Sequence, residues 1–472
     1  MKILRIIKKT LYPGFRYLIH RINRWQKASL DFTLWGLGIN IQGHLVIGEC
    51  DTVELAKRYG TPLHVVDKDL LQKNYQEFYE SFKSHNIDFE IYYSYKTNTI
   101  PAILQVLHEN GAGAEVISPY ELWLALELNV NPNLIIYNGP NKPAEGLKLA
   151  IEHGIKMINI NSFGEIDRIE NIARELGKKP KVGVRIFSGV GWESQFGFGL
   201  KSGEALRAFE KLSKISCVEV AGIQIHLGTL IKNTDTFEVA IENIFKFINE
   251  IKDKLGICIK YVDLGGGFGV PAVKSFGRIE ARLHRHLNKA YLPPNIKKAP
   301  SMREFANKIV NAVQRECERY KLRMPVLLFE PGRAITSNAQ ILLAKVGDVK
   351  EGSEGLKIAF IDGGINVANP LIWEYHEIFV ANKMNSHPED FYRLAGSISS
   401  PADLLNRNKK LPRLEVGDII SIMDAGAYFM SFSINFPVPR PAMVMVSESK
   451  NWVVRERETY EDMTHLEKFH KD

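Results

Sequence analysis

Short apolar runs, rich in β-branched and aromatic residues, recur between about residues 88 and 331 and alternate with longer segments of helical periodicity. Strands that alternate with helices in this way pair in parallel through right-handed crossovers. Eight such units within about 250 residues predict an α/β fold, a (β/α)8 barrel. The runs are 89–95, 114–117, 134–137, 157–160, 182–187, 220–225, 261–264 and 326–329, with 271–300 as an inserted excursion.

The predicted secondary structure changes after Arg333, where strand-like runs follow one another without long helices between them. The runs 339–349, 356–361, 418–423 and 442–446 predict a second, all-β domain, and we expect the stretches 44–47 and 63–66 to join it. The expected segments are a basic amphipathic extension (1–40), strands joining the β domain (41–68), the barrel (69–335), the C-terminal β domain (336–455) and a polar tail (456–472).

The positive charge of the chain is concentrated at its start. Residues 1–30 hold eight Lys or Arg and no Asp or Glu, and without them the 61 basic residues fall to 53 against 54 acidic ones. One interpretation is an amphipathic segment that touches an anionic membrane surface or an acidic carrier protein. The other is a solvated helix on its own body, or a frayed terminus. The balanced remainder argues against a nucleic-acid partner.

The cysteines and the hydropathy pattern exclude several classes of protein. The four cysteines are far apart and form no CxxC pair or Cys/His cluster, so neither a disulfide framework nor a metal site is expected. No apolar run reaches 18 residues, so no transmembrane segment is expected. Charge also interrupts the apolar stretches of the N-terminus, which disfavours a secretory signal. These features favour a cytoplasmic enzyme.

Chemically reactive groups follow most of the predicted barrel strands. Because the carboxyl ends of the strands carry the active site in such barrels, these groups are expected on one rim. The set comprises Lys96, Asn138, Asn161, Arg185, His226, a glycine triplet (Gly265, Gly266, Gly267) and Glu330. Together they indicate a catalytic site more strongly than any one of them does.

Lys96 ends an apolar strand in the sequence Tyr-Ser-Tyr-Lys-Thr-Asn. Burial disfavours the charged amine, and the neutral amine is the form that makes Schiff bases. The alternative is a lysine that only extends to the rim. The glycines after Asp263-Leu264 could offer backbone N–H groups to a phosphate, or form an ordinary turn. Their spacing is not that of a dinucleotide fingerprint.

The remaining rim residues also allow two interpretations each. His226 could stack on an aromatic cofactor ring or be a satisfied core histidine. Glu330 could meet a pyridine nitrogen and keep it protonated, or form a salt bridge at the barrel bottom, which its place at a strand end disfavours. Arg185 and Arg333 could bind anions of substrate or cofactor, or pair with carboxylates such as Glu330.

These motifs resemble the fold-type III pyridoxal phosphate decarboxylases that act on diaminopimelate, ornithine and arginine, from about residue 45 to residue 450. The resemblance implies an alanine-racemase-like barrel, a Greek-key-like β domain, and a homodimer with shared active sites. It implies that Lys96 holds pyridoxal 5′-phosphate as a Schiff base and that His226 stacks on the ring. Glu330 would meet the ring nitrogen, and the other expected cofactor contacts are Arg185, Thr229, Gly265, Gly266, Gly267 and Tyr428.

Several motifs are similar to the diaminopimelate branch of this family, but the sequence departs from it at the substrate end. Where the family carries Gly-Pro-x-Cys-Glu-Ser-x-Asp, this chain has Ser399 in place of the cysteine and Ser400 in place of the glutamate. Asn369-Pro370 replaces an Arg-Pro that grips a substrate carboxylate in diaminopimelate decarboxylases. A serine hydroxyl is a poorer proton donor than a thiol.

The sequence therefore predicts a lyase, an α-decarboxylase of an amino acid, with Lys96, His226 and Ser399 as catalytic residues. Arg333, Tyr375 and Ser400 are the expected substrate contacts. The changed loop favours a modified, conjugated or carrier-tethered amino acid over free diaminopimelate. Two alternatives are open: racemisation or other Cα chemistry on the same cofactor, and a catalytically impaired homologue that acts as a regulator.

Overall fold

The computed structural model describes residues 29–191, 195–287, 289–352 and 356–468, so the basic arm at 1–28 lies outside the described residues. The chain divides into two compact units. Among the described residues, one unit, the barrel unit, lies within 72–270 and 298–336, and the other, the β unit, lies within 29–71, 271–297 and 337–468. The excursion expected at 271–300 thus belongs mainly to the β unit. No helix of the described residues is long and apolar enough to cross a membrane.

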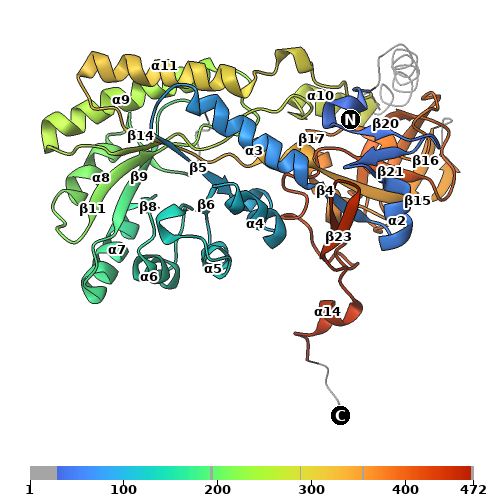
Figure 1. Cartoon of the computed structure of the whole chain (residues 1–472), viewed down its shortest axis with the longest axis horizontal. Coiled ribbons are helices and arrows are strands. Elements are labelled where there is room, and N and C mark those ends of the chain that lie inside the picture. Colours follow the sequence, from blue (N-terminus) through green and yellow to red (C-terminus); the bar gives the residue numbers. More distant parts are fainter. Residues whose placement is uncertain (1–28, 192–194, 288, 353–355, 469–472) are drawn as a thin grey trace, which may run out of the picture. The chain divides into compact units, whose positions relative to one another are not determined.

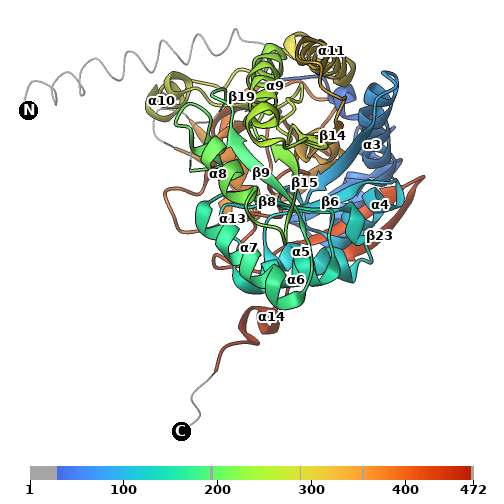
Figure 2. The same ribbon diagram turned by 90° about the vertical axis from the view of Figure 1, so that its left-hand side faces the viewer.

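The barrel unit is a closed ring of eight parallel strands with helices around it (Figures 1 and 2). The ring runs β9-β11-β12-β14-β5-β6-β7-β8 and closes through the pairing of β8 with β9. The strands are β5 Phe89–Ser94, β6 Gly113–Val116, β7 Ile135–Tyr137, β8 Met157–Ile160, β9 Lys181–Phe187, β11 Glu219–Gln224, β12 Tyr261–Asp263 and β14 Val326–Phe329. The predicted barrel is confirmed, and each predicted run overlaps one of these strands within two residues at either end.

Eight helices precede or separate these strands and bury their apolar faces against the ring. They are α3 Lys68–Lys83, α4 Pro101–Glu109, α5 Pro119–Glu127, α6 Ala144–His153, α7 Phe163–Leu176, α8 Glu204–Leu212, α9 Asp235–Leu255 and α11 Met302–Tyr320. In α9 the buried residues recur at helical spacing, including Phe237, Ile241, Ile244 and Ile248. This periodicity places the apolar residues along one side of the helix, and that side packs against the strands.

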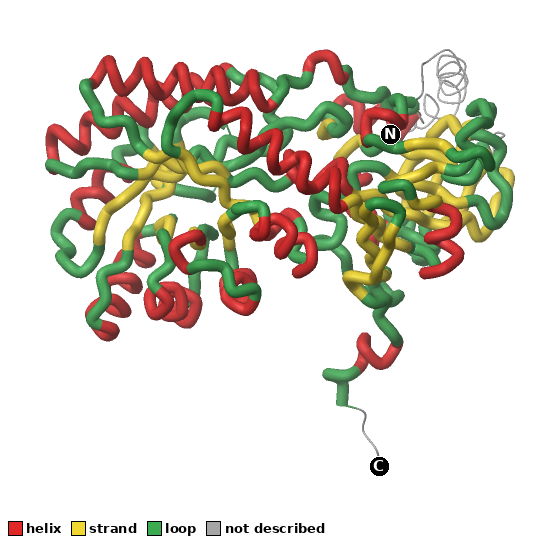
Figure 3. Tube along the Cα trace, in the orientation of Figure 1, coloured by secondary structure: helices red, strands yellow, loops and turns green. Residues whose placement is uncertain are grey.

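The β unit is built around a nine-stranded sheet, and more of its residues lie in strands than in helices (Figure 3). The main path runs β20-β19-β16-β15-β4-β22-β23, while β21 pairs with β15 and β18 pairs with β21. These strands are β4 Leu63–Asp67, β15 Gln340–Glu351, β16 Lys357–Ile361, β18 Ile378–Val380, β19 Asp390–Ala395, β20 Leu404–Leu411, β21 Ile419–Ile422, β22 Ala442–Ser447 and β23 Lys450–Arg455. The strand expected at 63–66 is β4, which pairs with β15 and β22.

Smaller elements complete the β unit. Three short strands, β1 Gly38–Ile39, β2 Leu45–Ile47 and β3 Cys50–Asp51, form a separate sheet, and β13 Lys274–Ser275 pairs with β17 Glu374–Tyr375. The helices of this part are α2 Thr52–Tyr59, α10 Arg278–Leu287, α13 Ile365–Ala368 and α14 Tyr460–Thr464, while α12 Arg333–Thr336 follows the last barrel strand.

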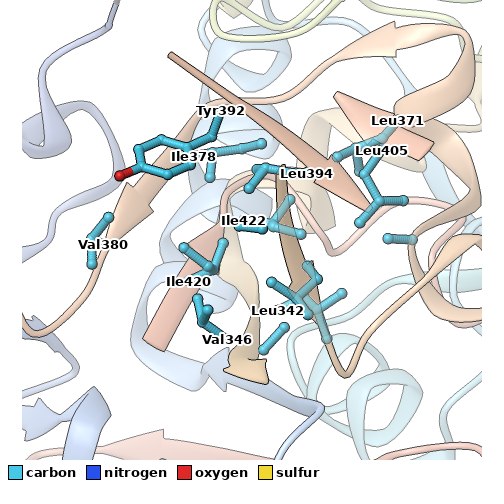
Figure 4. Packing of buried hydrophobic residues seen from close by; sticks show 14 of the residues in the cluster. Leu342, Val346, Leu371, Ile378, Val380, Tyr392, Leu394, Leu405, Ile420 and Ile422 are labelled. Carbon is cyan, nitrogen blue, oxygen red and sulfur yellow. The ribbon is translucent and has the colours of Figure 1, made fainter. Parts of the chain in front are cut away.

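A buried apolar cluster on one face of the sheet forms a core of the β unit (Figure 4). Leu342 and Val346 from β15 pack with Ile420 and Ile422 from β21 and with Leu394 from β19. Alternate residues of each strand point into this cluster, as the two-residue period of a strand requires.

The last residues of the expected N-terminal extension (1–40) are part of the β unit. Trp35, in a short helix at Phe32–Trp35, is only 1% exposed and belongs to a buried cluster of the β unit. Its indole Nε1 donates a hydrogen bond of 2.8 Å to Asp424. A buried tryptophan with a satisfied N–H anchors this segment in the fold.

A buried ion pair ties together the ends of two barrel strands. Lys142, in the loop between β7 and α6, is fully buried, and its Nζ lies 2.6 Å from Glu165 Oε1 in α7. The same ammonium donates to the carbonyls of Gly139 (2.9 Å) and Asn159 (2.7 Å). Burial lowers the pKa of Lys142, but the facing Glu165 carboxylate favours the charged form. The pair thereby fixes the carboxyl ends of β7 and β8, which carry Asn138 and Asn159.

We expect Lys142→Met to lower the free energy of unfolding by about 3–5 kcal/mol, because it leaves the Glu165 carboxylate buried without its counter-charge. The double variant Lys142→Met/Glu165→Gln removes that charge and should recover most of the loss. Urea denaturation of the full chain, followed by circular dichroism, measures the free energy of unfolding of both variants. Equal destabilisation in the single and double variants would contradict this account.

Candidate active site

Lys96 lies where β5 ends, in a single turn of 3-10 helix at Tyr95–Thr97. Its ammonium donates a hydrogen bond of 2.9 Å to Glu115 Oε2 on the neighbouring strand β6. The lysine side chain is 31% exposed, whereas Glu115 is completely buried. The amine therefore reaches the surface of the barrel rim with a buried carboxylate beneath it.

Glu115 keeps its negative charge although it lies inside the barrel. Burial pushes its pKa upward, but the Lys96 ammonium and hydrogen bonds from Ser94 and Asn138 outweigh burial and lower the pKa below its ordinary value. An opposite charge and donated hydrogen bonds both favour the ionised form of a carboxyl group. Lys96 is in turn held beside a permanent counter-charge.

Two asparagines connect this pair to the opposite side of the barrel. Asn138 Nδ2 donates to Glu115 Oε1 at 2.9 Å and to Glu330 Oε1 at 2.6 Å. Asn159 Nδ2 donates to Asn138 Oδ1 at 2.7 Å, which fixes the orientation of that amide. Asn138 is thus the one residue of this network whose side chain bonds to both carboxylates.

Glu330 and Asp263 form a second buried acidic group at the ends of β14 and β12. Burial raises the pKa of Asp263 well above its ordinary value, and the charge of Glu330 and the hydrogen bond between the Asp263 and Glu330 side chains add to this effect. Burial and the charge of Glu115 raise the pKa of Glu330 as well. Two carboxylates this close cannot both ionise in a buried site. The upward shifts of both pKa values favour retention of a proton by the pair, and the larger shift assigns that proton to Asp263.

The glycine triplet allows the ends of three strands to approach one another closely. A Cβ at Gly265 would lie 2.5 Å from the carbonyl oxygen of Ile225, and one at Gly266 would lie 2.2 Å from that of Glu330. Gly267, with φ of 86°, faces the carbonyl of Gly228 in the same way. Only glycine fits such positions. Within the described residues, the backbone N–H of Gly267 donates no hydrogen bond to the protein, so it is available to an anion.

His226 and Arg185 flank the same opening. Burial, with the cations Lys96 and Arg185 nearby, lowers the pKa of His226 to about 3, so its imidazole is neutral at pH 7. Burial also lowers the pKa of Arg185, while Glu330 and Glu115 oppose this effect. The Arg185 guanidinium lies 4.7 Å from the ring centre of Phe196. Thr229 follows in the loop after β11, and Arg333 is buried at the start of α12.

The structure thus brings together on the barrel rim seven of the residues that the sequence predicted for the site. They are Lys96, Arg185, His226, Gly265, Gly266, Gly267 and Glu330. Tyr428, Ser399, Ser400 and Tyr375 belong to the β unit. Tyr428 has a positive φ of 71°, and its ring lies 6.0 Å from that of Phe432.

The loop that carries Ser399 and Ser400 is organised by a buried aspartate. Asp403 is 3% exposed, and its carboxylate accepts hydrogen bonds from the backbone N–H of Ile365 (2.8 Å) and Ile398 (2.7 Å). Ser400 Oγ accepts from Ala402 N at 3.2 Å, whereas Ser399 is exposed. Ser399 therefore presents an exposed hydroxyl, as does Ser397 in the same loop.

Tyr375, which the sequence predicts as a substrate contact, is a buried residue of the β unit. It is only 3% exposed, and its hydroxyl donates to Glu377 Oε2 at 2.6 Å. Burial and the Glu377 carboxylate raise its pKa well above the ordinary value. Glu377 also pairs with Lys409 from β20. The Tyr375 side chain is thus part of a buried polar cluster of the β unit, and its hydroxyl is already engaged.

Sequence reasoning missed four polar residues of the site and its support: Glu115, Asn159, Asp263 and Lys142. Each is at most 1% exposed. A signal existed for two of them, since Glu115 and Asp263 are single acidic residues inside predicted apolar strands. Charged residues are almost never fully buried unless they are paired, so such positions point to a polar interior.

The donor set fits an anionic aromatic aldehyde. A reachable amine stands over a buried carboxylate, a carboxyl pair can face a ring nitrogen, and a glycine backbone leaves an N–H free for phosphate. These are the contacts that pyridoxal phosphate requires of a protein.

Comparison with known proteins agrees with this fit. Residues 69–337 match the family described as "Pyridoxal-dependent decarboxylase, pyridoxal binding domain". A diaminopimelate decarboxylase from Methanothermobacter thermautotrophicus is 33% identical over 90% of this chain and 96% of its own length. The corresponding enzyme of Bacillus subtilis is 31% identical over 91% of this chain and 96% of its own length.

Solved structures give the same result for the fold. The diaminopimelate decarboxylase of Methanocaldococcus jannaschii superimposes with a TM-score of 0.82 and 30% identity, over 92% of this chain and 98% of that one. Another structure of that enzyme is a complex with L-lysine. The family match covers more than half of this chain, and the relatives align over nearly all of it. The chain therefore belongs to the pyridoxal-dependent decarboxylases and is an amino-acid decarboxylase that uses pyridoxal phosphate.

Proposed function

We propose that this enzyme removes the α-carboxylate of an amino acid as CO2 and that Lys96 is the residue that holds the coenzyme. The observation that supports the proposal is the Lys96 amine on the barrel rim, 2.9 Å from the buried and ionised Glu115. When bound, pyridoxal phosphate supplies an electron-accepting ring that stabilises the negative charge left at Cα.

The acidic network sets the protonation of the site. Glu330, which shares a proton with Asp263, is the carboxyl that we assign to the ring nitrogen. Asn138 holds the Glu330 oxygen in position and donates at the same time to Glu115. His226, neutral at pH 7, can lie against a flat ring without repelling the nearby cations. For the phosphate we assign the glycine backbone with Arg185, Thr229 and Tyr428.

Substrate choice is the point at which this chain differs from the diaminopimelate branch. An uncharged amide at Asn369 cannot replace an arginine as a partner for a distal carboxylate. Ser400 likewise lacks the charge that would hold a distal ammonium, which leaves Arg333 as the assigned substrate cation. We therefore propose a modified, conjugated or carrier-tethered amino acid, with Ser399 returning the proton to Cα. For a tethered substrate, the basic arm at 1–28 would face an acidic carrier.

We further propose a cytoplasmic homodimer with shared active sites. All four cysteines are free, which fits a reducing compartment. Trp373 and Phe432 contact each other on the β unit yet are 38% and 48% exposed, and Ile434 and Phe436 beside them are about equally exposed. Apolar side chains gathered in this way mark a protein–protein contact in many oligomers.

We expect the wild-type enzyme to release CO2 stoichiometrically from its substrate and Lys96→Ala to release none. Borohydride should reduce the holoenzyme to a pyridoxyl adduct on Lys96, and the variant should give no adduct. Lys148→Ala, on the exposed face of α6, is the matched control and should behave as wild type. The panel should include meso-diaminopimelate, L-lysine and Nε-acylated forms of both.

Three results of this experiment would contradict the proposal in different ways. Loss of optical activity without CO2 would indicate a racemase. Bound coenzyme with no turnover of any substrate would indicate a regulator. Efficient turnover of free diaminopimelate, above that of every modified amino acid, would contradict only the proposed substrate.

We expect Asn138→Ala to lower kcat by about 10- to 100-fold, because hydrogen bonds to charged groups contribute roughly 1.5–3 kcal/mol. Asn138 lowers the pKa of both Glu115 and Glu330, so its loss should raise both values. The acidic limb of the pH–rate profile should then move to higher pH. Asn161→Ala, on the next strand end, donates to neither carboxylate and should leave that limb in place. If the acidic limb of the pH–rate profile does not move in Asn138→Ala, the role of Asn138 is structural only.

Mixed subunits can test whether active sites are shared. Ser399→Trp, at an exposed position, should abolish activity alone, while Ser397→Trp, also at an exposed position and two residues earlier, should not. After exchange of subunits between Ser399→Trp and Lys96→Ala, one site in each mixed dimer escapes both changes if the loop serves the partner. Activity should then return to about one quarter of wild type, the statistical limit for a two-fold symmetric dimer. No recovery would contradict a shared site.

A further inference from the structure

A cavity of about 260 Å³ lies at the end of the barrel opposite to Lys96. It is bounded by the last turns of α9, by the chain that enters β12 and by the loop that enters β14. Those are the amino ends of the strands, whereas Lys96, His226 and Glu330 follow carboxyl ends. The cavity therefore belongs to the barrel unit but not to the site described above.

The wall of this cavity is mainly apolar. It includes the side chains of Phe245, Ile248, Ile257, Ile259 and Val262. An apolar cavity of about 150 Å³ is large enough to bind benzene and excludes water. The present cavity thus has room for a somewhat larger body, such as a fused aromatic ring or a chain of about eight carbons.

The charged residues at the cavity are all of one sign. Lys252, on the last turn of α9, and Arg323, in the loop before β14, line it together, and no carboxylate does. Within the described part of the chain neither forms an ion pair, although nearby Lys254 pairs with Glu250 at 2.6 Å. Two cations with no protein counter-charge, beside an apolar wall, are complementary to an anion with an apolar body.

We propose that this cavity binds a small free amphiphilic monoanion, a carboxylate or sulfonate on a short alkyl or aromatic body. The anion lies between Lys252 and Arg323, and the body fills the space against Phe245 and Ile248. A double-chain lipid is too large for the cavity, so the ligand is a soluble metabolite. Because the site lies at the other end of the barrel, binding does not require the coenzyme.

Cys258 provides a direct readout, because its exposed thiol lines the same cavity. The experiment uses the full chain with Cys217→Ser, which leaves Cys258 as the only exposed cysteine of the described residues. The rate of its reaction with a disulfide reagent is measured with octanoate, octylamine and octanol. Octanoate should slow labelling at least tenfold at saturation, and octylamine should have no effect.

Three variants distinguish the parts of the site. Lys252→Ala/Arg323→Ala should weaken the binding of octanoate at least tenfold. Lys254→Ala, two residues further along α9 and paired with Glu250, should leave octanoate binding unchanged. Ile257→Trp should fill the cavity and abolish protection while circular dichroism stays unchanged. Equal protection by octylamine, or none by octanoate, would overturn the proposal. Neither result would bear on CO2 release, so failure here leaves the proposed decarboxylase unaffected.

Discussion

Three carboxyl groups inside one barrel are the constraint that the active site has to satisfy. Glu115, Asp263 and Glu330 are each at most 3% exposed, and three buried like charges could not coexist. The structure resolves this in two ways, by a cation and amide donors at Glu115 and by a retained proton on the pair Asp263–Glu330. The same arrangement leaves one amine above a fixed negative charge and one carboxyl able to face a ring nitrogen. The chemistry of the site is therefore set by how the acidic groups share charge.

That arrangement depends on backbone geometry more than on side-chain packing. The three acidic groups come from strands β6, β12 and β14, whose ends meet only because the ring is closed and parallel. Gly266 allows β12 to approach the carbonyl of Glu330 at a distance that no Cβ would permit. On the other side, the buried Lys142 holds the ends of β7 and β8 together and so supports Asn138. The glycines and Lys142 thus serve the same end, a fixed spacing between polar groups.

The barrel strands were predictable from the sequence because each is a short run of mainly apolar residues, as expected for strands buried on both faces. β19 and β20 were not, because β20 reads Leu-Leu-Asn-Arg-Asn-Lys-Lys-Leu and buries Asn408 and Lys409. Lys409 is buried only because Glu377, 32 residues earlier, supplies its counter-charge, and such a partner is invisible to local periodicity. The rim residues were predictable because strand ends converge. Their partners inside the strands, Glu115 and Asn159, required the register of neighbouring strands to be known.

Two features of the chain support the proposed change of substrate over the alternative of a catalytically impaired homologue. Buried carboxylates are costly, and a chain that no longer used them would lose little by replacing them with apolar residues. Here the barrel retains the full acidic network and its supporting lysine. The loop of Ser399 and Ser400 also keeps its frame, since the Asp403 carboxylate still caps two backbone N–H groups. Side chains have changed at the positions expected to meet the substrate, while the groups that would hold the coenzyme are intact. That division is the one expected when a fold keeps its reaction and takes a different substrate.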